Sequence, residues 1–260
     1  MSAGKTLARS LVSRALSILD SSIREGWMAA TLRETPIEQL AEALDVLCHD
    51  AEQAVPGSRE VMVSIVQVIN AEDAGPLAQL LREEAAGRSL VALARFLRRP
   101  HVVAHDDRTA EERVPDYGTG RPLTLGERKA LARKPNRASF DALLRDPHPD
   151  VIRNLLANPK LTEDDVVRLA ARRPPRPDIL TEIARTSRWA TKARVRMAIV
   201  LNPGSPPELA VPLVSLLVRH ELKLVMQVTE ANPAVRAAAH ENLVRRPPSL
   251  GGHKKDDGAG

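Results

Sequence analysis

Cysteine and aromatic residues are scarce in this chain of 260 residues. It has one cysteine, Cys48, and five aromatic residues: Trp27, Phe96, Tyr117, Phe140 and Trp189. A single cysteine excludes an intramolecular disulfide and any metal site built from several thiolates. So few aromatic side chains leave little surface on which unpaired nucleic-acid bases could stack. Because β-rich domains usually carry more Tyr, Phe and Thr, the Leu- and Ala-rich composition favours helices.

Long hydrophobic runs are also missing. No window approaches the roughly 18 uncharged apolar residues that a membrane-spanning helix needs. In residues 1–20, Arg9, Ser13 and Arg14 interrupt the apolar positions, so the unbroken stretch of a signal peptide is absent. With 43% apolar residues the chain can still build a core. We therefore expect a globular, cytoplasmic protein without a membrane partner.

Charge is distributed unevenly along the chain. Residues 1–120 hold 13 Lys and Arg against 18 Asp and Glu, whereas residues 121–246 hold 23 against 13. This reversal of sign predicts a domain boundary near residue 120. The chain has 30 arginines and 8 lysines, a skew that codon bias produces as readily as selection for a ligand.

Residues 1–100 are predicted to form a helical N-terminal domain of about five helices. Apolar residues recur at helical spacing over 7–23 and 37–48, and two more helices fit 76–84 and 89–98. Residues 59–70 are rich in β-branched side chains and could form a strand. Because no partner strand is visible, we predict a buried helix there.

The helical pattern stops at residues 101–122, which are polar and interrupted by prolines and glycines. We interpret them as a linker that leads to a second domain at 123–246. Residues 247–260 have nothing to bury, and we predict a disordered tail.

The second domain contains an internal repeat. Equivalent apolar positions lie 44 residues apart: Val151, Val195 and Ala239; Leu155, Ile199 and Leu243; Leu156, Val200 and Val244. A second match relates residues 123–135 to 161–174 at a shift of 38. Three helix starts have a hydroxyl residue followed three positions later by a carboxylate, the pattern of a capping box: Thr124 and Glu127, Thr162 and Asp165, Ser205 and Glu208.

These signals predict three units of three short helices each. The expected helices are 124–133, 137–146 and 149–158; 163–172, 177–187 and 191–201; 206–218, 220–230 and 233–246. A short helix with one apolar face cannot bury that face alone, so the units should stack on one another.

Three Asn-Pro pairs are expected to end helices, at Asn158, Asn202 and Asn232, and residues 149–151 read Pro-Asp-Val. With these motifs, residues 146–174 resemble the leucine-rich-repeat-variant class of α-solenoid, a relative of armadillo and HEAT arrays. The resemblance extends loosely over residues 121–246. It does not cover residues 1–120, and it implies a C-terminal right-handed α-solenoid with a binding function. Together with the helical N-terminal domain expected from periodicity, this predicts an all-α fold. A known member of the class carries an iron–sulfur cluster on a Cys-rich segment. Those cysteines are missing here, so no cofactor is implied.

No catalytic or metal site is predicted. The Gly-x-Gly at residues 118–120 lacks the strand and the lysine of a phosphate-binding loop. His101 and His105 have the spacing of metal ligands but lie in the predicted linker. Cys48 and His49 are neighbours on a helix and point in different directions, so a buried, unreactive thiol is expected. We predict that the protein is not an enzyme.

Basic side chains form the candidate partner-binding site. The predicted residues are Arg172, Arg173, Arg176, Arg185, Arg188, Trp189, Lys192, Arg194 and Arg196. Arginine near a helix C-terminus also satisfies backbone carbonyl groups, so a structural role competes with ligand binding. We predict a protein-binding scaffold or adaptor with an acidic protein partner. Nucleic-acid binding through phosphate contacts is the alternative, and the oligomeric state stays open.

Overall fold

The structure is a computed structural model of the chain, and it describes residues 3–53, 55–71, 74–98 and 114–245. These residues form sixteen α-helices and one short 3-10 helix, and no strand. The all-α prediction is therefore confirmed for the described part of the chain. The predicted tail, most of the predicted linker, His101 and His105 lie outside the described residues.

Six helices make up the N-terminal region (residues 3–98): α1 Ala3–Ser17, α2 Ser21–Glu34, α3 Ile37–Glu52, α4 Ser58–Ile69, α5 Gly75–Gly87 and α6 Val91–Phe96. The apolar stripe over 7–23 does not form one continuous helical face. Asp20 accepts hydrogen bonds from the N–H groups of Ser22 and Ile23 at 2.9 and 3.0 Å and so starts a new helix. As a result Leu19 is 91% exposed and Ile23 is 64% exposed.

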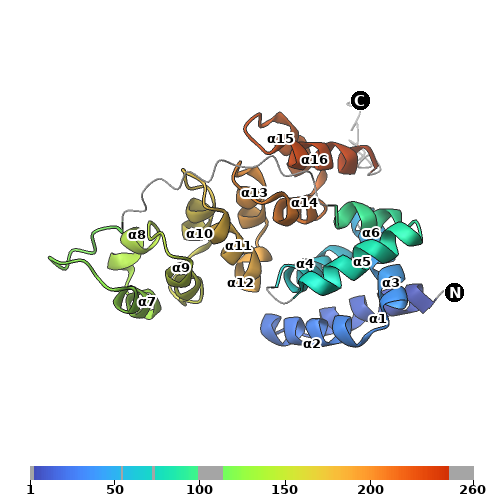
Figure 1. The fold of residues 1–260 in the computed structure, drawn as a ribbon, viewed down its shortest axis with the longest axis horizontal. Coiled ribbons are helices and arrows are strands. Elements are labelled where there is room, and N and C mark those ends of the chain that lie inside the picture. Colours follow the sequence, from blue (N-terminus) through green and yellow to red (C-terminus); the bar gives the residue numbers. More distant parts are fainter. Residues whose placement is uncertain (1–2, 54, 72–73, 99–113, 246–260) are drawn as a thin grey trace, which may run out of the picture.

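The C-terminal region (residues 114–245) arranges its helices in a row that follows the chain order (Figure 1). Its helices are α7 Leu125–Arg133, the 3-10 helix Arg137–Ser139, α8 Phe140–Leu143, α9 Pro149–Leu156, α10 Glu163–Ala170, α11 Pro177–Arg185, α12 Ser187–Ala190, α13 Ala193–Leu201, α14 Pro207–Val214, α15 Arg219–Gln227 and α16 Pro233–Arg245. The first and third helix of each predicted unit pack together: α7 on α9, α10 on α13, and α14 on α16.

Helix α4 lies where the two regions meet. Residues 61–68 are all buried, so neighbouring helices cover this part of α4 on every side. Helices α1, α2, α3 and α5 pack against α4, and α12 and α14 of the C-terminal region do so as well. The prediction of a buried helix at residues 59–70 is confirmed.

Two asparagines tie neighbouring helix pairs together in the same way. Asn158 and Asn202 are each 2% exposed, and their Nδ2 atoms donate to the carbonyl oxygens of Ala132 and Ala170, at 2.7 Å in both cases. The two acceptors, Ala132 and Ala170, are 38 residues apart, and the two donors are 44 residues apart. These are the two spacings found in the sequence repeat, so the same hydrogen bond recurs in consecutive units. Asn232 differs, because it opens α16 by accepting from the Ala234 N–H at 2.9 Å. The prediction that its Asn-Pro pair ends a helix is wrong.

The predicted capping boxes also differ between the first two sites and the third. Those of Thr124 with Glu127 and of Thr162 with Asp165 are both formed. The third predicted box, at Ser205, is not formed. The Ser205 hydroxyl donates instead to the Ile199 carbonyl oxygen at 2.5 Å, and α14 begins after Pro206 without a side-chain cap.

Candidate partner-binding surfaces

Trp189 is buried in the core rather than exposed at the surface. It is 3% exposed, and its Nε1 donates to the carbonyl oxygen of Leu156 at 2.8 Å. The guanidinium carbon of Arg188 lies 4.3 Å from the centroid of the Trp189 ring. Arg188 also donates to the carbonyl oxygens of Asn158 and Leu161, at 3.0 and 3.2 Å. This pair therefore connects the α12 segment to the turn after α9.

Several other predicted arginines also bind backbone carbonyl groups. Arg172 donates to Leu144 at 3.5 Å and Arg176 to Pro147 at 2.7 Å. Arg196 donates to the carbonyl groups of Ala190, the last residue of α12, and of Thr191. The burial of Arg196 lowers the pKa of its guanidinium. Binding of carbonyl groups next to helix ends is the structural role that competes with a ligand surface.

The remaining predicted residues are divided between two environments. Arg185 donates to the carbonyl oxygen of Asn70 at 3.0 Å and so joins the two regions. Arg173, Lys192 and Arg194 are exposed, and Arg194 pairs with Asp164 at 2.6 Å. The nine residues consequently do not form one exposed patch.

A buried carboxylate links the first two predicted units. Asp165, 1% exposed, accepts from Arg137 at 2.7 Å and from Arg168 at 2.6 Å, and it completes the cap with Thr162. Burial acts to raise the pKa of Asp165. The hydrogen bonds from Arg137, Thr162 and Arg168 outweigh this effect and hold the pKa well below the usual value of an aspartate.

Two sequence features that suggested chemistry have structural explanations. Gly118 and Gly120 have φ angles of 70° and 71°, so this Gly-x-Gly forms turns that need a left-handed backbone. Cys48 is 4% exposed, and its burial raises the pKa of the thiol, which opposes a nucleophilic role. Within the described ranges, no group of three or more His, Cys, Asp or Glu side chains could hold a metal ion. No described helix is long and apolar enough to cross a membrane.

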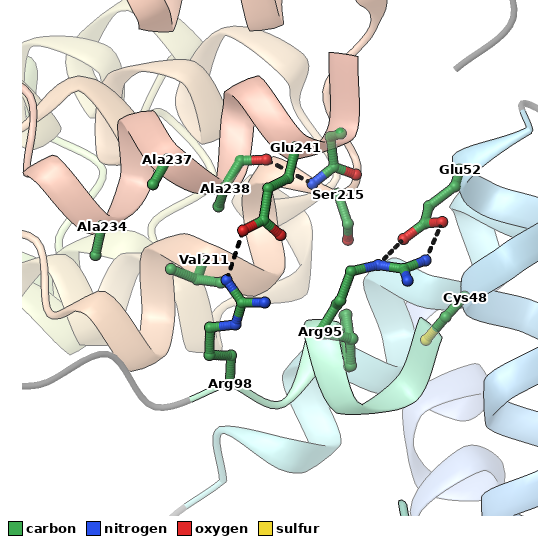
Figure 2. Close-up of a pocket in the computed structure, with 12 residues that line it drawn as sticks. Cys48, Glu52, Arg95, Arg98, Val211, Ser215, Ala234, Ala237, Ala238 and Glu241 are labelled. Atoms are coloured by element: carbon green, nitrogen blue, oxygen red, sulfur yellow. Dashed lines mark hydrogen bonds and ion pairs between the residues drawn. The ribbon is translucent and has the colours of Figure 1, made fainter. Parts of the chain in front are cut away.

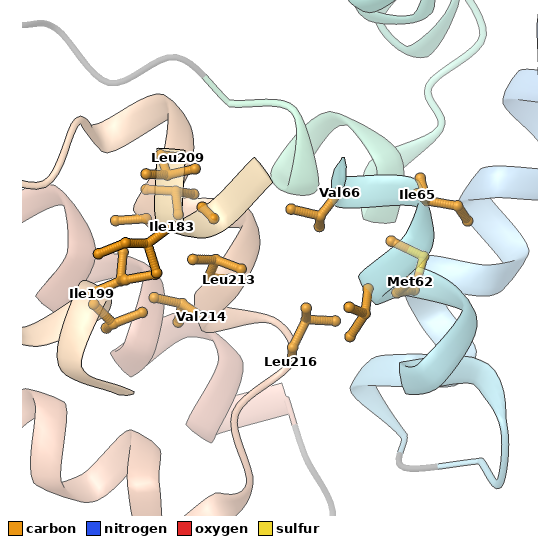
Figure 3. Close-up of a cluster of buried hydrophobic side chains, with 14 of the residues drawn as sticks. Met62, Ile65, Val66, Ile183, Ile199, Leu209, Leu213, Val214 and Leu216 are labelled. Atoms are coloured by element: carbon orange, nitrogen blue, oxygen red, sulfur yellow. The ribbon is translucent and has the colours of Figure 1, made fainter. Parts of the chain in front are cut away.

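The two regions meet at an apolar contact around α4. Figure 3 shows Met62 and Val66 on one side of this contact and Leu213 and Leu216 on the other. A polar contact lies nearby, where Arg98 pairs with Glu241 at 2.8 Å. This ion pair lowers the pKa of Glu241. The junction is thus built from residues more than a hundred positions apart in the sequence.

A pocket of about 190 Å³ lies at this junction, and we call it the junction pocket (Figure 2). Cys48 and Phe96 line it from the N-terminal region, and Val211, Ala234 and Ala238 line it from the C-terminal region. No sequence signal indicated this pocket, because neither region alone contains both of its walls.

The polar groups of the junction pocket differ in their pairing. Arg95 makes two hydrogen bonds to the Glu52 carboxylate at 3.1 and 2.5 Å, so this charge pair is internally satisfied. Asn242 is 9% exposed, and its Nδ2 donates to the Ala238 carbonyl oxygen at 2.9 Å. Its Oδ1 is buried and has no hydrogen-bond partner. Among the described residues that line the pocket, Asn242 therefore has a buried side-chain acceptor without a partner.

The last helix pair leaves one repeat position uncovered. Leu156 and Val200 are 0% exposed, but the equivalent Val244 is 71% exposed. A shallow groove of about 370 Å³ lies on α15 and α16, lined by Met226, Pro233, Arg236, Ala237 and His240. We call this groove together with Val244 the end face. The sequence alignment identified Val244 as the equivalent of two apolar residues, but it did not indicate that Val244 would be exposed.

Comparison of the chain with protein-family models, with curated proteins and with solved structures finds no match.

Proposed function

We propose that this protein is a non-enzymatic, protein-binding scaffold whose residues 123–245 form a right-handed α-solenoid of the armadillo and HEAT type. The end face would be its docking site. The observation that carries the proposal is the exposure of Val244, 71%, at a position where both earlier units are fully buried. An apolar residue left uncovered at the end of a stack supports binding of a further element.

The occupant we propose is an amphipathic helix of a partner protein. In the earlier units, further helices pack on the helix that carries the equivalent residue: α11 packs on α9, and α14 and α15 pack on α13. A partner helix would continue this packing with apolar side chains three and four residues apart. Arg236 and His240 line the groove, and no acidic side chain does. Acidic residues beside the apolar stripe would complement these groups.

Nucleic-acid binding through the basic face remains the alternative. Lys192 and Arg194 are exposed and could contact phosphates. Most of the other predicted basic residues bind carbonyl groups within the chain. This internal use favours the protein-binding proposal.

Photo-cross-linking from the full-length chain tests the end face. A cross-linking amino acid at Val244, and separately at His240, should capture one partner through a segment with an apolar helical stripe and acidic flanks. The same amino acid at Leu80, an exposed apolar position on α5, is the control and should not capture it.

Binding of that partner is then measured with purified proteins. Val244→Asp should weaken it at least about tenfold, since a charge would enter the apolar contact, whereas Leu80→Asp should not. Equal binding by the two variants would exclude the end face. Captured material that disappears on nuclease treatment would instead support the nucleic-acid alternative.

A further inference from the structure

We propose that the junction pocket binds a small, neutral, ring-shaped molecule that carries one hydrogen-bond donor, of the phenol or indole class. The proposal does not depend on the docking of a partner at the end face. It rests on the volume of the pocket, the character of its walls and the buried oxygen of Asn242.

The volume sets the size of the ligand. An apolar protein cavity of about 150 Å³ holds one benzene molecule. The junction pocket measures about 190 Å³, so it has room for one aromatic ring with a substituent or a small fused ring. A flexible peptide or a nucleotide is too large to be enclosed there.

The walls set its polarity. Phe96, Val211 and Ala238 are 4%, 5% and 8% exposed, and each places an apolar side chain at the pocket. The Arg95 guanidinium is already engaged by Glu52, and the Arg98 guanidinium by Glu241. A charged ligand would therefore lose its water without gaining a counter-ion, which disfavours it. Phe96 offers a ring edge or face to an aromatic ligand.

Asn242 supplies the one specific polar contact. Donation from its Nδ2 to the Ala238 carbonyl oxygen fixes the orientation of the amide, so the unpaired atom is the oxygen. Most buried polar atoms in folded proteins have a hydrogen-bond partner. A ligand O–H or N–H would satisfy this acceptor, and an otherwise identical hydrocarbon would not.

Binding would also connect the two regions. The pocket has walls from α3 and α6 on one side and from α14 and α16 on the other. A ligand that contacts both walls binds only when they are together, so it stabilises their contact by mass action. The pocket would thus couple a small molecule to the arrangement of the two helical regions.

Calorimetric titration of the full-length protein with phenol, indole, toluene and benzoate tests the proposal. Phenol and indole should bind saturably at one site and raise the melting temperature. Toluene should bind at least about tenfold more weakly, since it lacks the donor, and benzoate should not bind. Absence of saturable binding by phenol and indole would mean that the pocket holds water only, and would overturn the proposal.

Substitutions test whether phenol binds in the junction pocket. Ala234→Leu should narrow the pocket and abolish binding of phenol, whereas Ala30→Leu, at an exposed alanine of α2, should leave it unchanged. Asn242→Leu should remove the preference for phenol over toluene. Undiminished binding by Ala234→Leu, or an unchanged preference in Asn242→Leu, would place the ligand elsewhere.

The rate of chemical modification of Cys48 in the wild-type chain provides an independent test that needs no substitution. Cys48 is its single cysteine and lines the pocket. Saturating phenol should slow the reaction of Cys48 with methyl methanethiosulfonate at least about threefold, in proportion to occupancy. If phenol binds saturably but the rate of Cys48 modification does not change, phenol does not bind in the junction pocket.

Discussion

Replacing Asn158 with alanine removes a side chain that holds two neighbouring helix pairs together. Its Nδ2 donates to the carbonyl oxygens of Ala132 and Lys134 at 2.7 and 2.9 Å, and its Oδ1 accepts from the Lys160 N–H at 3.0 Å. Asn158 is 2% exposed, and Ala132 is fully buried. Water therefore has little access to the Ala132 carbonyl group, which the substitution would leave unpaired.

The size of the effect follows from the burial of each group. The buried carbonyl group of Ala132 would lose its partner, which costs about 1–3 kcal/mol. Lys134 and Lys160 are exposed, so water can replace the hydrogen bonds of their backbone groups. We expect the free energy of unfolding to fall by about 1–3 kcal/mol. For a chain of this size that corresponds to a decrease of roughly 2–12 °C in melting temperature.

Urea unfolding followed by circular dichroism at 222 nm measures the loss. The matched control is Asn154→Ala on the same helix, where the amide donates to the Asp150 carbonyl oxygen of its own helix and accepts from the Arg133 Nε at 2.8 Å in a solvent-exposed hydrogen bond that water can replace. We expect this control to cost about 0.5 kcal/mol or less. Asn158→Asp loses the donor and places a buried carboxylate against two carbonyl oxygens, so it should cost at least as much as Asn158→Ala. If Asn158→Ala costs no more than Asn154→Ala, the asparagine does not hold the helix pairs together.

Three further predictions concern stability. Gly204→Ala should destabilise the protein by about 1–3 kcal/mol, because the new Cβ would overlap the Pro175 ring. Gly126→Ala faces open space and should stabilise α7 by about 0.4–1 kcal/mol. Thermal melts in which Gly204→Ala is the more stable variant would contradict this packing. Because the pKa of Asp165 is lowered in the folded state, its contribution to stability is present above the unfolded pKa of about 3.9 and is lost as the pH falls through the folded pKa. The gap in urea midpoint between wild type and Asp165→Asn should therefore be constant near pH 7 and shrink below about pH 4, and a gap that widens on acidification would refute the assignment. Leu155→Ala, at a fully buried position, should cost about 2–5 kcal/mol, and an unchanged urea midpoint would mean that this helix face is not in the core.

Local signals predicted several helices of the C-terminal region closely. The predicted helix 137–146 was wrong, because the 3-10 helix Arg137–Ser139 and the short α8 replace it, and α12 was not predicted. The predicted range 149–158 corresponds to α9 at Pro149–Leu156, and 163–172 corresponds to α10 at Glu163–Ala170. Caps and prolines act within a few residues, so the sequence around a helix end contains most of the information that sets it. The same locality explains the error at Asp20, where one capping carboxylate starts a new helix inside a continuous apolar stripe.

The roles of the basic residues could not be read from the sequence. Arginines spaced three and four residues apart are consistent with an exposed basic stripe. In the structure Arg176, Arg185 and Arg188 reach carbonyl groups that other segments bring close. Trp189 is likewise buried because the α9 segment lies beside it, with the Leu156 carbonyl oxygen as its acceptor. Such contacts depend on long side chains crossing between helices, and spacing along one helix carries no information about them.

The sequence by itself determined the helical class, the positions of most C-terminal helices and the two asparagines that recur with the repeat. Each of these depends on interactions within a short segment or on a pattern that the chain repeats. Only the tertiary structure decided that α4 joins the two regions, that the junction pocket has walls from both, and that Val244 is exposed while its equivalents are buried. The reason is that burial depends on which distant segment covers a residue, and residues such as Cys48 and Asn242 share a pocket only after the chain has folded.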